Sequence, residues 1–175
     1  MVTKYKPKNL SVIFRKLERE NARAVISVAA SLIEYALEQV IMTRLRKPRD
    51  DSEQKELFNE NGILGTFSEK ISAAYFLKII GPKARRELDL IRRIRNQAAH
   101  DMNPISFDRT EEIAARCREL SFGSEAVANG IVPSKPRHKF LAITRFFAAN
   151  LLMRSGDNTA EIPQAFGQLA PSLDN

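Results

Sequence analysis

The sequence predicts an all-α protein, a bundle of five to seven helices. Gly is scarce and Trp is absent, with 7 and 0 copies in 175 residues, whereas Ala, Leu, Ile, Arg and Glu are abundant. Apolar residues recur every three or four positions over several long stretches, which is the period of an amphipathic helix. No stretch has the pattern expected of a β-strand. We therefore expect one helical domain over residues 1–154, followed by a flexible tail over 155–175 that Gly and Pro interrupt.

The predicted elements are bounded by capping and helix-breaking residues. A weakly amphipathic helix is expected from Ser11 to about Asn21, and the longest helix from Ala22 to Arg46, where Pro48 stops it. The remaining helices are expected over Asp50–Phe58, from Thr66 or Ser68 to Ile80, over Pro82–His100, from Ser106 or Asp108 to Leu120, and over Pro136–Arg154.

The apolar stripe of the Ala22–Arg46 helix is unusually wide. It holds apolar residues at ten positions between Ala22 and Ile41, so one neighbouring helix is too narrow to cover it. The stripe is therefore expected to be core, with part of it at a subunit interface. This is one reason to predict a homodimer.

Composition narrows the classes of function. A net charge of +7 and a pI near 9.8 favour RNA or another polyanion as a partner. No apolar run suits a membrane span or a signal peptide, so we expect a cytoplasmic protein without membrane contact. The single Cys117 excludes an intrachain disulfide and is expected to be a core thiol. Two His and no Cys pair predict neither a metal site nor a cofactor.

A second basic cluster lies at the start of the last predicted helix. Lys135, Arg137, His138 and Lys139 occupy the end of that helix where the dipole disfavours positive charge. Their position points to an anionic ligand or an acidic neighbour, although a solvated run of charge is the alternative.

The stretch from Leu88 to His100 is the candidate functional element. On a helix, Leu90, Ile91, Ile94 and Ala98 fall on one side and would be buried. The opposite side carries Asp89, Arg93, Asn96 and His100. A solvated, Arg-rich helix face would have the same pattern.

The residues on this face suit RNA chemistry. Arg95 offers a planar donor fork for a phosphate, His100 can accept or give a proton near neutral pH, and Asn96 both donates and accepts hydrogen bonds. Together they are candidates to bind a phosphodiester and to cleave RNA without a metal. The surrounding Arg86, Arg92 and Arg93 are candidate nucleic-acid-binding residues, within the densest cationic stretch of the chain.

Two family resemblances bear on this stretch. The run from Arg95 to His100, RNQAAH, resembles the R-x4-H signature of the HEPN superfamily. That resemblance implies a helical nucleotide-binding or RNA-cleaving domain, often of a toxin–antitoxin or defence system. It also implies that two protomers pair so that both motifs line one cleft, which is the second reason to predict a homodimer.

The broader resemblance covers most of Leu17 to Leu120. Leu57-Phe58, the block Gly62-Ile63-Leu64-Gly65-Thr66-Phe67-Ser68, the stretch Ile71–Tyr75 and the run Ile91–His100 resemble the MltR family of mannitol operon repressor-like proteins. Ile63 departs from the family, which usually has Pro at that position. The resemblance implies a transcriptional regulator, yet no convincing helix-turn-helix is present, because Gly81-Pro82 leaves too short a turn.

Three functions follow from these observations. The first is a HEPN-like RNA-binding protein or metal-independent endoribonuclease of toxin or defence type. The alternative is a mannitol repressor-like regulator that acts through protein contacts and has no catalysis. The third is a helical homodimer whose Arg-rich face binds an acidic partner protein. A protein partner, antitoxin or regulator, fits all three.

Overall fold

The computed structural model describes residues 10–121, 134–156 and 173–174, and over these it is all-α. The described part contains seven helices and no strand, as predicted. They are α1 (Leu10–Leu17), α2 (Ala22–Met42), α3 (Asp51–Phe58), α4 (Phe67–Phe76), α5 (Pro82–His100), α6 (Glu111–Glu119) and α8 (Pro136–Arg154).

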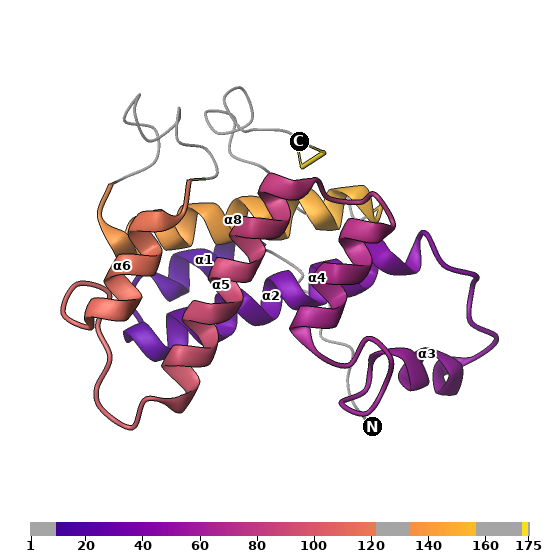
Figure 1. Ribbon diagram of the computed structural model, residues 1–175, viewed down its shortest axis with the longest axis horizontal. Coiled ribbons are helices and arrows are strands. Elements are labelled where there is room, and N and C mark those ends of the chain that lie inside the picture. Colours follow the sequence, from indigo (N-terminus) through magenta and orange to yellow (C-terminus); the bar gives the residue numbers. More distant parts are fainter. Residues whose placement is uncertain (1–9, 122–133, 157–172, 175) are drawn as a thin grey trace.

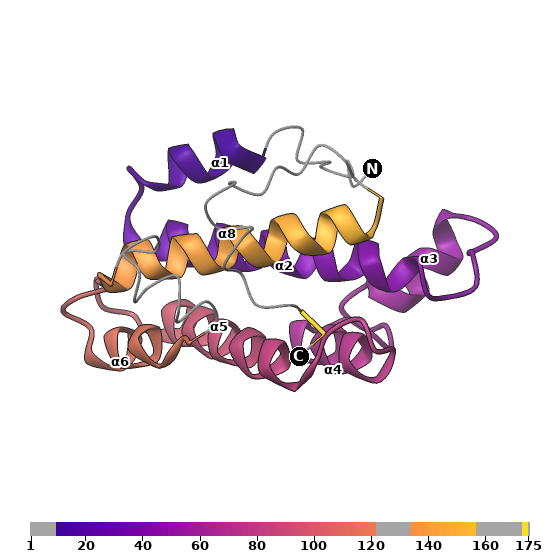
Figure 2. The same cartoon turned by 90° about the horizontal axis from the view of Figure 1, so that it is seen from above.

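The helices form three layers. Seen from above, α1 lies on one side, α2 and α8 lie side by side in the middle, and α6, α5 and α4 form a row on the other side (Figure 2). Helix α3 lies at one end, beyond α4 (Figure 1). This arrangement places α5 at the front of the molecule, between α4 and α6.

Helix α2 is the centre of the core. The ten apolar residues of its predicted stripe, between Ala22 and Ile41, are buried, and the helix packs against α8, α5, α4 and α1 of the same chain. By length and composition α2 is also apolar enough to cross a membrane, but here it is the core helix of the bundle. One chain therefore covers the stripe that we expected to need a second subunit. That reason for a homodimer was wrong, and the homodimer itself stays a prediction.

Helix α2 ends at Met42, four residues earlier than the predicted end at Arg46. The hydroxyl of Thr43 donates to the carbonyl of Val40 at 2.7 Å, and the Thr43 amide also bonds in this last turn. The fully buried stripe stops at Ile41, and Leu45 beyond the end of the helix is only partly buried against the core. Local hydrogen bonding and the end of the apolar pattern decide this boundary before Pro48 is reached.

Helix α4 also ends early, at Phe76 instead of Ile80. Lys78 adopts a left-handed conformation with φ of 55°, and the amides of Ile79 and Ile80 donate to the carbonyl of Ala74. This left-handed termination turns Ile79 and Ile80 into the core, where both are buried. Burial of these two side chains therefore replaces the last predicted turn.

Helix α6 begins at Glu111 after Thr110, not at Ser106 or Asp108. The hydroxyl of Ser106 instead accepts from the amides of Asp108 and Arg109, both at 3.3 Å, and forms a turn before the helix. The predicted capping residue thus caps a turn rather than the helix itself.

The Gly-rich turn before α4 is tightly packed against α3. A Cβ atom at Gly62 would lie 2.4 Å from the carbonyl oxygen of Glu56 and 2.5 Å from that of Leu57, so only Gly fits there. Thr66 then caps α4, and Glu69 bonds back to its amide in a capping box. These hydrogen bonds lower the pKa of Glu69, so the cap is expected to weaken as pH falls below about 4.5.

Two residues of the predicted flexible tail, Leu173 and Asp174, contact the helical bundle. Leu173 is buried, and its carbonyl accepts from the amide of Gly81. Asp174 pairs with Arg154 at 2.6 Å. Most of residues 155–175 lie outside the described part of the chain. These contacts anchor residues 173–174, and a flexible tail over 155–175 otherwise stays a prediction.

Two residues of the basic cluster at the start of α8 contact backbone carbonyls. Arg137 donates to the carbonyls of Leu17, Glu18 and Glu20, at and after the end of α1, and Lys139 donates to the carbonyl of Arg118 near the end of α6. The negative ends of two helix dipoles thus account for these charges without an anionic ligand.

Candidate functional site

Helix α5 presents a line of two Arg side chains and one His side chain to solvent. Pro82 occupies its first turn, and Leu90, Ile91, Ile94 and Ala98 are buried against the bundle as predicted. Arg86, Arg93 and His100 are exposed on the other side. They are spaced seven residues apart, so they lie along one line with about 10 Å between neighbours.

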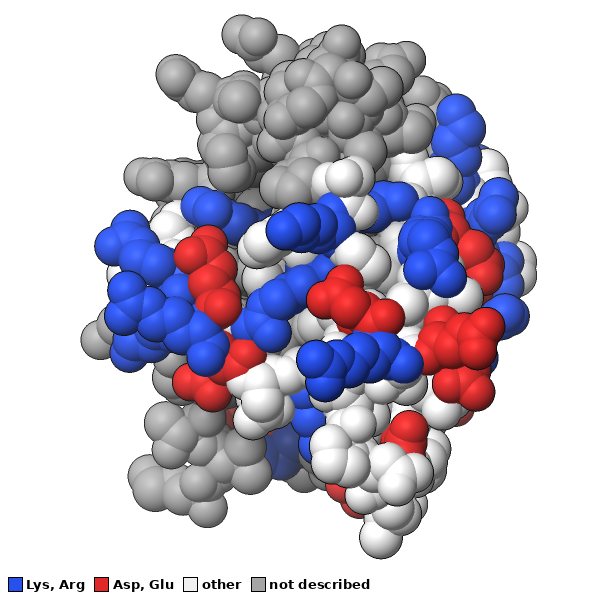
Figure 3. Space-filling view, turned by 90° about the vertical axis from the view of Figure 1, so that its left-hand side faces the viewer, with Lys and Arg blue, Asp and Glu red and all other residues white. Residues whose placement is uncertain are grey.

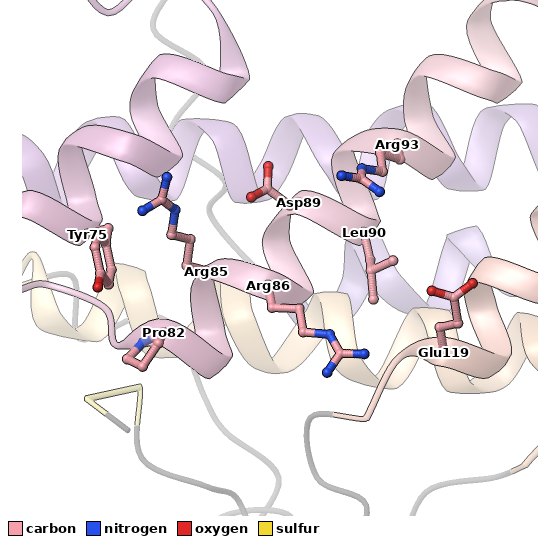
Figure 4. A pocket seen from close by; sticks show the side chains of 8 residues that line it. All are labelled: Tyr75, Pro82, Arg85, Arg86, Asp89, Leu90, Arg93 and Glu119. Atoms are coloured by element: carbon pink, nitrogen blue, oxygen red, sulfur yellow. The ribbon is translucent and has the colours of Figure 1, made fainter.

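A hollow lies over the first half of α5, and we call it the α5 groove. It has a volume of about 440 Å³. Figure 4 shows α5 as its floor, Tyr75 of α4 on one side and Glu119 of α6 on the other. The residues that line it are Tyr75, Pro82, Arg85, Arg86, Asp89, Leu90, Arg93 and Glu119.

Aromatic side chains hold one wall of the α5 groove. The guanidinium of Arg85 lies 4.6 Å from the centre of the Tyr75 ring and 5.8 Å from that of Phe76. The two rings meet edge to face at 5.5 Å. Phe76 is nevertheless 75% exposed. The wall is therefore preorganised by cation–π contacts and offers an uncovered aromatic ring beside the groove.

Arg95 of the predicted catalytic set faces α2 and α4. Its guanidinium lies 4.0 Å from a carboxylate oxygen of Glu34, and the Lys70 ammonium lies 2.9 Å from the other oxygen of that carboxylate. His100 comes five positions after Arg95, which places the two residues about 140° apart around the helix. Arg95 is thus engaged in a structural ion cluster, while Asn96 is half-buried and His100 is exposed on a different face.

The predicted nucleic-acid-binding residues divide in the same way. Arg86 and Arg93 line the α5 groove. Arg92 instead donates to the carboxylate of Asp89 at 3.2 Å and is only half-exposed. The structure therefore brings two of these three arginines to one site.

The end of α5 is clamped by a residue that the sequence reasoning did not identify. Arg23 of α2 donates to the carbonyls of Ala98, Asp101 and Asn103. It fixes the turn that carries His100, which is otherwise exposed. The sequence did contain one indication that Arg23 has a specific partner. It lies in the first turn of α2, where the helix dipole disfavours a positive charge.

Glu87 on α5 was also not identified. It is buried, and its carboxylate accepts from the amide of Ser121 at 3.0 Å and from the Ser121 hydroxyl at 2.9 Å. Burial lowers the pKa of Lys139, and the negative charge of Glu87 partly opposes this shift. These contacts tie the segment after α6 to α5 and so fix one border of the α5 groove.

Charge is mixed on the face at the α6 end of the molecule. Figure 3 shows Lys and Arg side chains interspersed with Asp and Glu across that face, without a continuous basic area. A polyanion with closely spaced charges would therefore meet repulsion there as well as attraction.

Cys117 lies fully buried in α6, as predicted for a core thiol. Burial raises its pKa to about 12 from an ordinary value of 9.0. A thiol reagent should therefore react only after unfolding. The unfolded chain loses this proton near pH 9 and the folded chain near pH 12, so stability should fall as pH rises between these values.

A Cys117→Ala variant is the control for that pH dependence. Urea titrations between pH 8 and pH 11 should give a shallower loss of stability in this variant than in the native chain. Equal slopes, or rapid labelling of Cys117 in the folded protein, would contradict the assignment of a buried neutral thiol.

Comparison with known proteins bears on this fold. No protein-family model matches the chain, and no curated protein matches it. A chain of the X-ray structure of the MtlR–HPr complex from Escherichia coli is similar, with a TM-score of 0.58. The chain has the fold of that helical protein. The match covers 83% of this chain and 97% of the other, at 19% sequence identity, so it establishes shared architecture and not shared residues. This agrees with the mannitol repressor resemblance at the level of fold; nothing in the comparisons supports the HEPN resemblance.

Proposed function

We propose that this protein is a cytoplasmic regulator, similar to a mannitol repressor, that acts through protein contacts and not through catalysis. The observation that carries the proposal is the α5 groove, where three arginines gather and Arg85 is held beside the exposed ring of Phe76. Arginine and aromatic side chains are enriched where proteins bind one another. The shared fold with a chain crystallised in a protein–protein complex supports the same function.

The arrangement of the helices does not suit sequence-specific DNA binding. Helix α5 is packed between α4 and α6, and Gly81 before it is buried. A recognition helix needs to protrude and to present polar side chains to a groove of the duplex. We therefore propose that regulation is exerted on a partner protein.

The proposed partner is a small HPr-type protein, because HPr is the partner named for MtlR in the similar complex. Calorimetric titration of this chain with HPr from the same organism tests the proposal. Saturable binding near 1:1, with co-elution of the two proteins in gel filtration, is the expected result. Absence of heat and of co-elution at high micromolar concentration would reject HPr as the partner.

RNA binding with metal-independent cleavage is the second candidate function. The observation in its favour is that His100 is exposed and that Asn96 lies four residues before it, on the same side of α5. Against it stands Arg95, whose guanidinium is directed to Glu34. A pair of protomers, as predicted from the sequence, would be needed to complete such a site.

Replacement of His100 tests this second function. If the protein cleaves RNA, His100→Ala should reduce the rate by about 10²–10⁴-fold, because a general acid or base is lost. Cleavage should persist in EDTA, and the variant should keep the melting temperature of the native chain since His100 is exposed. Arg95→Ala should also weaken binding and cleavage. A folded native protein that cuts no RNA, or a His100→Ala variant that still cuts, would reject a ribonuclease based on His100.

A further inference from the structure

We propose that the α5 groove binds an acidic helix of a partner protein, whose carboxylates are spaced seven residues apart. This inference rests on the proposed regulatory function and adds the binding surface and the chemistry of the partner. It is carried by the spacing of the cations on α5, the mixed charge of the groove and the exposed ring of Phe76.

The spacing of the cations defines the geometry of the partner. Arg86 and Arg93 lie seven residues apart on α5, and His100 continues the same line by a further seven. A second helix laid along α5 repeats its own side chains with the same rise and period. Carboxylates at positions i and i+7 of such a helix would therefore face Arg86 and Arg93 together.

The borders and floor of the α5 groove suit the docking of a helix from a partner protein. Tyr75 on α4 and Glu119 on α6 border the floor formed by α5, and Leu90 is a buried apolar residue within that floor. The described part of the chain has no sheet edge to which an extended peptide could add a strand. Docking by side chains of an amphipathic helix is the mode that this architecture allows.

The charges of the α5 groove favour an acidic protein over a nucleic acid. Arg85, Arg86 and Arg93 contribute three positive charges, while Asp89 and Glu119 contribute two negative ones. A nucleic-acid strand carries a charge about every 3.4 Å along the duplex axis and would meet both carboxylates. Two isolated carboxylates on a helix can reach Arg86 and Arg93 and avoid Asp89, which Arg92 already pairs at 3.2 Å.

Phe76 supplies the apolar contact. Its ring is 75% exposed and is held beside Arg85, so little side-chain freedom remains to be lost on binding. The few residues that contribute most of the binding energy at protein interfaces are often aromatic residues and arginines. The partner helix is therefore expected to carry a large apolar residue next to one of its carboxylates.

A designed peptide tests this inference without knowledge of the partner. The probe is a labelled, Ala-rich helical peptide of about 20 residues, a length at which such a helix is substantially formed. It carries Glu residues seven apart with Leu residues beside them, and the control peptide has the same composition with Glu residues five apart. Fluorescence anisotropy should show tighter binding of the first peptide to the full chain.

Charge reversal locates the binding site. The double variant R86E/R93E should bind the peptide about tenfold more weakly or worse, and a peptide with Lys in place of Glu should recover binding to that variant. The matched control is R44E/R46E, which reverses two exposed arginines after the end of α2. It should bind the acidic peptide much more strongly than R86E/R93E does. Phe76→Ala should weaken binding while leaving the melting temperature unchanged.

The outcomes separate this inference from the proposed function. Equal binding of the two peptides, or of R86E/R93E and the native chain, would overturn the groove assignment even if HPr binds. Groove-dependent binding of the peptide without any HPr binding would keep the groove and reject HPr as the partner. Binding of a labelled single-stranded RNA that R86E/R93E abolishes, with no binding of the acidic peptide, would overturn the inference in favour of a nucleic-acid site.

Discussion

Glu34→Ala should lower the free energy of unfolding by about 3 kcal/mol or more, because it leaves a buried cation without its partner. Lys70 is only 4% exposed, and its ammonium lies 2.9 Å from the Glu34 carboxylate. Arg95 shares the same carboxylate at 4.0 Å. The Phe58 ring also lies 6.0 Å from the Lys70 ammonium, but a ring cannot replace a carboxylate. Urea denaturation followed by circular dichroism measures the loss.

A double variant distinguishes this mechanism from a simple loss of packing. Lys70→Met removes the buried charge and keeps much of the side-chain volume, so the pair Glu34→Ala/Lys70→Met should recover most of the stability lost in Glu34→Ala. If the double variant is less stable than Glu34→Ala alone, the ion pair is not the origin of the effect.

Phe140→Ala should lower the free energy of unfolding by about 3–5 kcal/mol through the cavity that it leaves. Phe140 is fully buried on α8, and its ring centre lies 5.5 Å from that of Phe107. The contact joins α8 to the loop before α6, so the substitution removes apolar contacts on both elements. Thermal and urea unfolding measure the effect.

Met153→Ala is the matched control on the same helix. Met153 is 46% exposed, so its truncation should change stability by about 0.5 kcal/mol or less. A Phe140→Ala variant as stable as Met153→Ala would mean that the packing of α8 against Phe107 does not stabilise the fold.

Composition and the spacing of apolar residues were enough to predict the all-α fold class and most of the helices. The 3.6-residue period of the apolar residues identified α2, α5 and α8 because burial of one helix face is the main source of helical stability. The Gly81-Pro82 pair and the polar residues before helices marked several starts, for the reasons of backbone geometry that hold in any fold. Ends were less certain, since local hydrogen bonds at Thr43 and the left-handed Lys78 decided them.

The contacts of each charged side chain depend on how the helices pack. The spacing of Arg95 and His100 already places them on different sides of α5, but it does not show that Arg95 meets Glu34 on α2, 61 positions earlier in the chain. The sequence analysis likewise did not identify the Arg23 clamp, which joins α2 to the end of α5, or the α5 groove, which is lined by residues of α4, α5 and α6. Helical periodicity fixes the face on which a residue lies, but the partner of a long charged side chain depends on which helix packs beside that face.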